Sequence, residues 1–152
     1  MTVRQKNGLG MERKFNIIGV QQIAIGGLTK EKNLNLWKDL FGLSETGSFV
    51  SEEHNVDETI LKLGDVEIDI MQPLDPDRKP AIHSRPLHHV GLWVDDLSEA
   101  YRYLKASGVR FVSDDPVCGA HGYKVLFIHP KASNEFPVSG EGVLIELIQY
   151  PG

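Results

Sequence analysis

The chain has 152 residues, of which 41% are hydrophobic and 24% charged, and a formal net charge of −5 at pH 7. This composition is ordinary for a folded domain, and the negative charge argues against a nucleic-acid partner. No apolar run approaches the roughly 20 residues that a membrane helix needs, so we expect no membrane contact. The single cysteine, Cys118, excludes an internal disulfide and favours the cytoplasm.

The chain is short enough for one domain. The polar residues 1–14 are typical of a flexible tail and lack the apolar stretch of a secretory signal. We expect a single domain over 15–150, in which a first module, 15–74, is joined to a second module, 87–150. The linker between them, 75–86, contains three prolines.

The first module begins with a strand pattern from Gln21 to Ile25. A helix pattern follows, with Thr29 as the candidate N-cap and Gly42 as the stop. Further strand patterns lie near 45–50, 59–63 and 67–72.

The second module repeats this order. His88-His89-Val90-Gly91-Leu92 matches the opening strand. The next helix has Asp96 and Glu99 at capping-box spacing and ends at Gly108. Strand patterns follow near 110–112, 125–129 and 144–149. The repeat predicts an α+β fold: two βαβββ modules that form a cupped, mixed or antiparallel sheet around a metal-binding cleft.

Strand alternation places four polar side chains at matching inward positions of the two modules. Gln22 matches His89 in the opening strands, and Asp69 matches Glu146 in the closing strands. By the same alternation, Trp93 is expected to line the cleft. Buried carboxylates are costly without a compensating cation. We therefore predict that these four residues bind one divalent ion, and a mixed oxygen and nitrogen set suits Co, Ni, Zn, Mn or Fe.

Several longer motifs resemble one superfamily. They are Gly119-Ala120-His121-Gly122, Phe127-Ile128-His129-Pro130-Lys131 and Gly142-Val143-Leu144-Ile145-Glu146-Leu147, with the ligand-bearing stretches Leu87-His88-His89-Val90 and Asp69-Ile70-Met71-Gln72-Pro73-Leu74. With them the chain is similar, over about Phe15 to Gln149, to the vicinal-oxygen-chelate superfamily (the glyoxalase/bleomycin-resistance fold). Within it, the chain most resembles the methylmalonyl-CoA epimerases, with glyoxalase I (lactoylglutathione lyase) next.

The resemblance to the epimerases implies a metal-dependent isomerase that abstracts the proton α to the carbonyl of an acyl-CoA thioester. It puts His89 and Glu146 at metal-ligand positions and gives proton transfer to Glu146 and Glu53. We also expect a homodimer. The chain departs from the epimerases at Gln22, where they usually have histidine, and at Asp69, where they have glutamine or glutamate.

Two other functions remain open. Gln22 is typical of a subgroup of glyoxalase I enzymes, so a lyase acting on a glutathione hemithioacetal is the first alternative. A non-catalytic small-molecule binding protein on the same fold is the second. An iron-dependent ring-cleaving dioxygenase is disfavoured, because its His/His/Glu triad is broken by Gln22. The stretch Ala132–Glu141, with the insertion Asn134–Glu141, is longer than in the epimerases and is expected to reshape the substrate mouth.

Overall fold

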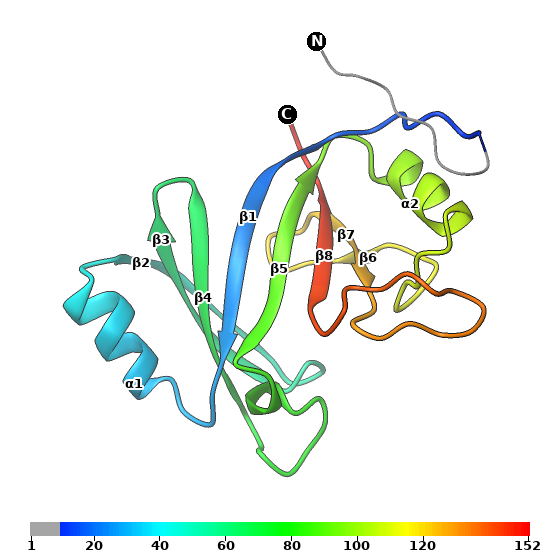
Figure 1. Ribbon diagram of the computed structural model, residues 1–152. Coiled ribbons are helices and arrows are strands. Elements are labelled where there is room, and N and C mark those ends of the chain that lie inside the picture. The colour runs from blue at the N-terminus through cyan, green and yellow to red at the C-terminus, as the bar shows by residue number, and fades with distance from the viewer. Residues whose placement is uncertain (1–9) are drawn as a thin grey trace. The chain divides into compact units, whose positions relative to one another are not determined.

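The computed structural model describes residues 10–152, and the chain divides into two compact units, each taken here by itself (Figure 1). The first-module unit comprises Gln21–Val90. The second-module unit comprises Gly91–Gly152 together with the described residues before Gln21. Residues 1–9 of the expected tail lie outside the described part, and the domain boundaries stay a prediction.

The first-module unit is a four-stranded mixed sheet with the hydrogen-bonded order β2-β3-β4-β1. β1 pairs with β4 in parallel, whereas β2 with β3 and β3 with β4 are antiparallel. Its elements are β1 (Ile17–Gly26, from Gln21 onward), α1 (Glu31–Leu34), the π-helix η1 (Asn35–Leu40), β2 (Ser44–Ser51), β3 (Val56–Leu63), β4 (Val66–Pro73), the 3-10 helix η2 (Ile82–Ser84) and the first half of β5 (Leu87–Val94).

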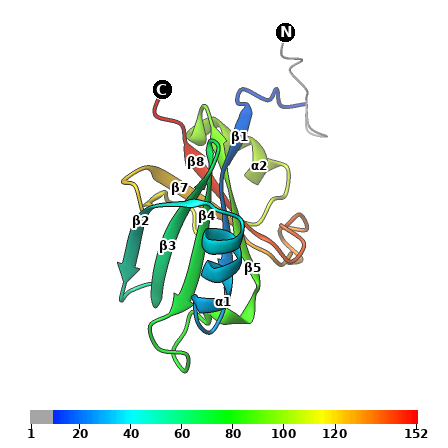
Figure 2. The ribbon, with the colours of Figure 1, turned by 90° about the vertical axis from the view of Figure 1, so that its left-hand side faces the viewer.

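The two faces of this sheet bury different residues, as strand alternation requires. On the helix face, Leu61, Ile68 and Ile70 form a buried cluster, against which Leu34 and Trp37 of α1 and η1 pack. Figure 2 shows α1 in front of the strands of this unit. On the opposite face a separate apolar cluster gathers at one end. Its members are Ala24, Val56, Met71 and Ile82, with Phe49 packed against them. The second face is therefore only partly apolar, which leaves room there for polar side chains.

The second-module unit has the strand order β5-β8-β7-β6. Its elements are the second half of β5, α2 (Leu97–Ala106), β6 (Val117–Cys118), β7 (Lys124–Ile128) and β8 (Leu144–Gln149). β7 is antiparallel to both β6 and β8. The core lies between α2 and one face of the strands. It contains Phe15, Val94, Leu97, Ala100, Val109, Leu126, Ile128 and Leu147.

The βαβββ order thus occurs twice, as the repeat predicts. In each copy one glutamine at the end of the last strand is hydrogen-bonded to the backbone at the start of the helix. In the first, Gln72 Oε1 accepts from the Lys30 amide just before α1, at 2.9 Å. In the second, Gln149 Oε1 accepts from the Leu97 amide at the start of α2, at 2.8 Å. Gln149 also donates to the Asp95 carbonyl at 2.7 Å. Both side chains satisfy backbone groups that a helix N-terminus leaves unpaired.

The helix ends agree with the sequence except at one cap. Asp96 caps α2 by accepting from the Glu99 amide at 3.1 Å, and Gly42 and Gly108 have positive φ angles beyond the helices. The prediction for Thr29 is wrong, because the residue at the N-cap of α1 is Lys30, without a side-chain cap. The Gln72 contact takes the place of such a cap.

Two strand predictions need correction. β3 begins at Val56, three residues before the predicted 59–63. The strand predicted at 110–112 is not a regular strand; instead, Val109 and Phe111 form isolated bridges to Val138 and Ile128. The short β6 completes the second module in its place.

The insertion Asn134–Glu141 packs against the end of α2. The Arg110 amide donates to the Val138 carbonyl at 2.8 Å, and the Val138 amide donates to the Gly108 carbonyl at 3.0 Å. A Cβ on Gly108 would lie 3.3 Å from the Pro137 ring. The insertion therefore runs beside Val109, just after α2, and its effect on the substrate mouth stays a prediction. No helix in the described part, 10–152, is long and apolar enough to span a membrane.

The linker is fastened to the first module by the fully buried Asn55, which has a φ of 53°. Its Nδ2 lies 2.9 Å from the carbonyl oxygens of both Asp75 and Arg78 and 3.1 Å from that of Pro80. Its Oδ1 accepts from the Asp75 amide at 2.9 Å and the Arg78 guanidinium at 3.0 Å. The linker then reaches η2, and a Cβ on Gly26 would collide with the Ile82 carbonyl.

Replacing Asn55 by alanine should lower the free energy of unfolding by about 3 kcal/mol. The change leaves buried backbone groups unsatisfied, at about 1–3 kcal/mol each, and puts alanine at a positive φ. Urea denaturation measures the loss. Asn55→Gly tolerates the positive φ but lacks the side chain. It should therefore recover only the part of the lost free energy of unfolding that comes from backbone strain. A loss below about 1 kcal/mol for the alanine variant would contradict the role of Asn55 as the main fastening of the linker.

Candidate functional site

Two of the predicted metal ligands share one face of the first-module sheet. Asp69 on β4 is the register partner of Ala24 on β1, and Gln22 lies two residues before Ala24. Because register partners point to the same side of a sheet, Gln22 and Asp69 both lie on the face opposite α1. Both are buried, with 8% and 2% of their surfaces exposed.

A second buried carboxylate on this face is one that sequence reasoning missed. Glu58 on β3 is the register partner of Met71, which lies two residues from Asp69 on the same side of β4. Only 6% of the Glu58 surface is exposed. Diagonal neighbours on paired strands lie about 7–8 Å apart, so a small substrate can contact both Glu58 and Asp69. The signal in the sequence was Val56-Asp57-Glu58-Thr59-Ile60, in which alternation from Val56 places Glu58 with Ile60.

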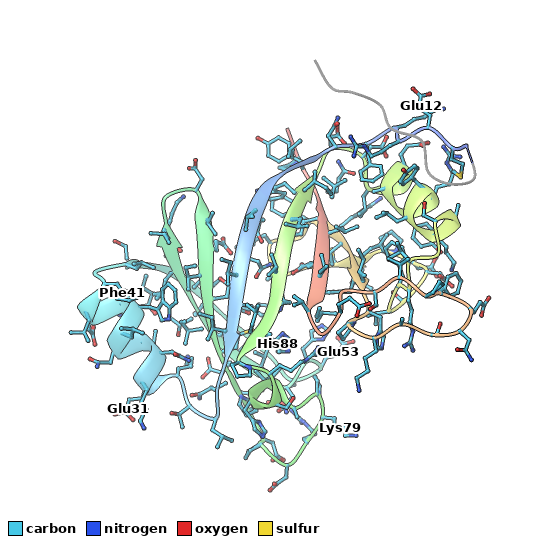
Figure 3. All side chains as sticks on the ribbon, in the orientation of Figure 1. Glu12, Glu31, Phe41, Glu53, Lys79 and His88 are labelled. Carbon is cyan, nitrogen blue, oxygen red and sulfur yellow. The ribbon has the colours of Figure 1, made fainter. Side chains whose placement is uncertain are left out.

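Glu53, which the resemblance gave the role of a base, lies elsewhere. It is exposed on the turn between β2 and β3 (labelled in Figure 3). That turn is held by neighbours of Glu53: the Arg78 guanidinium bonds Glu52 at 3.3 Å, and the Asn55 amide donates to the Glu52 carbonyl at 3.3 Å. Glu53 is thus outside the paired part of β3, whereas Glu58 is within it.

His89, the third predicted ligand in this unit, is buried and contacts its neighbour His88. Their Nδ1 atoms lie 2.8 Å apart. Burial, followed by the charges of His89 and Arg85, lowers the pKa of His88 to about 3, so His88 is neutral at physiological pH. If His89 donates its Nδ1 proton to His88, its Nε2 is the unprotonated nitrogen, which is the form of histidine that binds a metal ion.

Glu146, the fourth predicted ligand, is described within the second-module unit. It is 5% exposed on β8, where Phe127 of β7 is its register partner. This face is opposite the α2 core, because Leu147 points into that core. A Cβ on Gly119 would lie 3.5 Å from Glu146 Oε1, an ordinary contact distance, so Gly119 lies beside the carboxylate.

An aromatic cluster occupies the same face of the second-module unit. The ring of Trp93 contacts those of Tyr123 and Tyr150 edge to face, with centroids 5.5 and 5.4 Å apart. His121 lies 6.2 Å from the Tyr123 ring. Trp93 is therefore on the Glu146 side of its strand, as alternation predicts. Cys118 is exposed and its thiol lies 3.6 Å from the Gly122 carbonyl.

The residue types of the predicted metal set fit a divalent ion: one amide oxygen, one imidazole nitrogen and two carboxylates, all on buried side chains. Within residues 10–152, no three His, Cys, Asp or Glu side chains are grouped closely enough to hold a metal by themselves. The four-residue set, which includes Asp69, His89 and Glu146, therefore stays a prediction.

Comparison with known proteins gives a family match over most of the chain. Residues 21–127 match the model of the Glyoxalase/Bleomycin resistance protein/Dioxygenase superfamily. A mitochondrial methylmalonyl-CoA epimerase of Dictyostelium discoideum is 32% identical over 140 residues, which cover 88% of this chain and 80% of that protein. An ethylmalonyl-CoA/methylmalonyl-CoA epimerase of Cereibacter sphaeroides is 34% identical, over 64% of this chain and 72% of its own.

The fold has solved counterparts. The crystal structure of methylmalonyl-CoA epimerase from Mycobacterium tuberculosis superposes with a TM-score of 0.73 at 23% identity, covering 90% of each chain. This likeness confirms the predicted fold class of paired βαβββ modules.

Proposed function

Because the chain belongs to the glyoxalase/bleomycin resistance protein/dioxygenase superfamily and is a relative of its methylmalonyl-CoA epimerases, we propose that it epimerises methylmalonyl-CoA or a close homologue of it. The observation that carries the proposal is a pair of buried glutamates, one in each module. Glu58 lies on the polar face of the first module, and Glu146 lies on the corresponding face of the second.

Epimerisation requires one group that removes the proton from C2 of the acyl chain and another that returns a proton to the opposite face of that carbon. We assign these steps to the carboxylates of Glu58 and Glu146. Glu58 takes the role that the sequence analysis gave to Glu53. Burial keeps bulk water from both carboxylates, which limits loss of the abstracted proton to solvent.

We propose that Gln22, Asp69, His89 and Glu146 hold one divalent ion, with Co, Ni, Zn, Mn and Fe as the candidates. Bound there, the ion would act as a Lewis acid on the thioester carbonyl oxygen. Support comes from the donor types, the burial of all four side chains and the His88–His89 contact. Within the chain itself, His88 orients the imidazole of His89.

Gln22 favours one alternative, a glyoxalase I-like lactoylglutathione lyase. That reaction also moves a proton next to a carbonyl, but it returns the proton to the neighbouring carbon of a glutathione hemithioacetal. A binding protein on the same fold has no need of a buried carboxylate beside Asp69, so Glu58 disfavours that alternative.

The experiment incubates the purified protein with methylmalonyl-CoA in deuterated water. We expect deuterium at C2, measured by mass spectrometry, in a reaction that a chelator abolishes and added metal restores. Methylglyoxal with glutathione is the parallel assay, in which no D-lactoylglutathione should form. The opposite pattern would establish the glyoxalase function and exclude the epimerase.

We further propose that the protein is a homodimer in the cytoplasm. The single cysteine, exposed at Cys118, is consistent with a reducing compartment. Sedimentation velocity would test the oligomeric state, and a monomer at assay concentrations would refute the dimer.

A further inference from the structure

The aromatic cluster formed by Trp93, Tyr123 and Tyr150 has no part in the proton transfer. Tyr150 is 45% exposed, and Trp93 and Tyr123 are half-buried. The interplanar angles of Trp93 with Tyr123 and Tyr150 are 71° and 81°. In such edge-to-face contacts the edge of one ring meets the face of the other, so the rings are not stacked face to face on one another.

The cluster is continuous with the proposed catalytic face. Tyr150 follows β8 directly, and its amide donates to the Val94 carbonyl at 2.8 Å, which prolongs the ladder. Tyr150 lies four positions after Glu146, so both point to the same side and their Cα atoms lie about 13 Å apart. The short acyl group of a malonyl thioester cannot reach from one to the other.

A ligand whose reacting carbon lies at Glu146 can therefore touch this cluster only with its carrier portion. In a coenzyme A thioester the carrier is long and ends in a single aromatic group, the adenine ring. Aromatic side chains bind nucleobases by stacking. His121 lies exposed beside Tyr123, where an imidazole can meet the phosphates next to the adenine.

We propose that Trp93, Tyr123 and Tyr150 form the subsite for the adenine ring of the coenzyme A thioester. The inference rests on the proposed function, because that function supplies the coenzyme A carrier. It assigns Tyr150 and Trp93 to carrier recognition, so their loss weakens binding of the carrier and leaves the chemistry at C2 intact.

The test compares methylmalonyl-CoA with methylmalonyl-pantetheine, which lacks the nucleotide. In Tyr150→Ala, KM for the coenzyme A ester should rise about tenfold, as expected for the loss of one base–aromatic contact. kcat for both substrates, and KM for the pantetheine ester, should not change. Phe41→Ala is the matched control, because Phe41 is an aromatic residue, 58% exposed, in the other module (labelled in Figure 3).

A binding assay keeps this test independent of turnover. The chain has two tryptophans, so in a Trp37→Phe background the fluorescence reports Trp93 alone. Adenosine 3′,5′-bisphosphate should quench it in a saturable manner, and Tyr150→Ala should weaken this binding about tenfold. Absence of quenching, or equal binding by Tyr150→Ala, would overturn the subsite. If the bisphosphate binds as expected but methylmalonyl-CoA is not epimerised, the proposed function fails while the subsite stands.

Discussion

Replacing Glu58 by glutamine is expected to lower kcat for epimerisation about 1,000-fold, within the range for loss of a general base. Glutamine keeps the shape of the side chain, and its amide cannot accept the proton from C2 at neutral pH. Glu58 is buried on the same sheet face as Asp69 and lies within the paired part of β3, so the strand fixes its position. Stopped assays of the epimer ratio give kcat, and circular dichroism checks the fold.

The matched control is Glu53→Gln, the same chemical change five residues away on an exposed turn. It should leave kcat within about twofold of the wild type, as expected for a surface substitution away from the reacting atoms. The isotope pattern adds a second readout. Glu58→Gln should still exchange the C2 proton of one epimer with solvent through Glu146. Loss of turnover in Glu53→Gln, with Glu58→Gln active, would return the role of the base to Glu53.

The difference between Glu58 and Glu53 shows which structural features a local sequence pattern does not predict. The repeat and its strands depend on the local periodicity of side chains, and the strands predicted at the positions of β1, β4, β5 and β8 are present. The start of β3 depends on the turn before it. Asn55 adopts a positive φ there and is bonded to linker residues 20 to 25 positions away, which no local pattern reveals. Because the sequence pattern starts this strand at Thr59, it leaves Glu58 outside the strand.

The insertion and the aromatic cluster were unpredictable for a similar reason. Val138 is held by backbone hydrogen bonds to Gly108 and Arg110, about 30 residues away. Every residue type offers these backbone groups, so the side-chain pattern does not predict such bonds. The inward direction of Trp93 was predictable from alternation, but its neighbours Tyr123 and Tyr150 come from a loop and from the end of β8. These three aromatic residues come together only through tertiary packing.

The His89→Ala variant should lose stoichiometric metal, because removal of the only imidazole from a four-residue donor set leaves oxygen ligands that bind Co, Ni or Zn weakly. Metal content after gel filtration, measured by inductively coupled plasma mass spectrometry, gives the result without reference to activity. Asp69→Asn should have a similar effect, since it removes one of the two carboxylates that balance the charge of the ion.

Two further variants make the test specific. His54→Ala removes an exposed histidine from the β2–β3 turn and should keep the full metal content. Gln22→His should retain the metal or bind it more tightly, because imidazole is the stronger donor for these ions. Unchanged metal in His89→Ala would show that the ion binds elsewhere. A large loss of affinity in Gln22→His would exclude Gln22 as a ligand and overturn the proposed four-residue set.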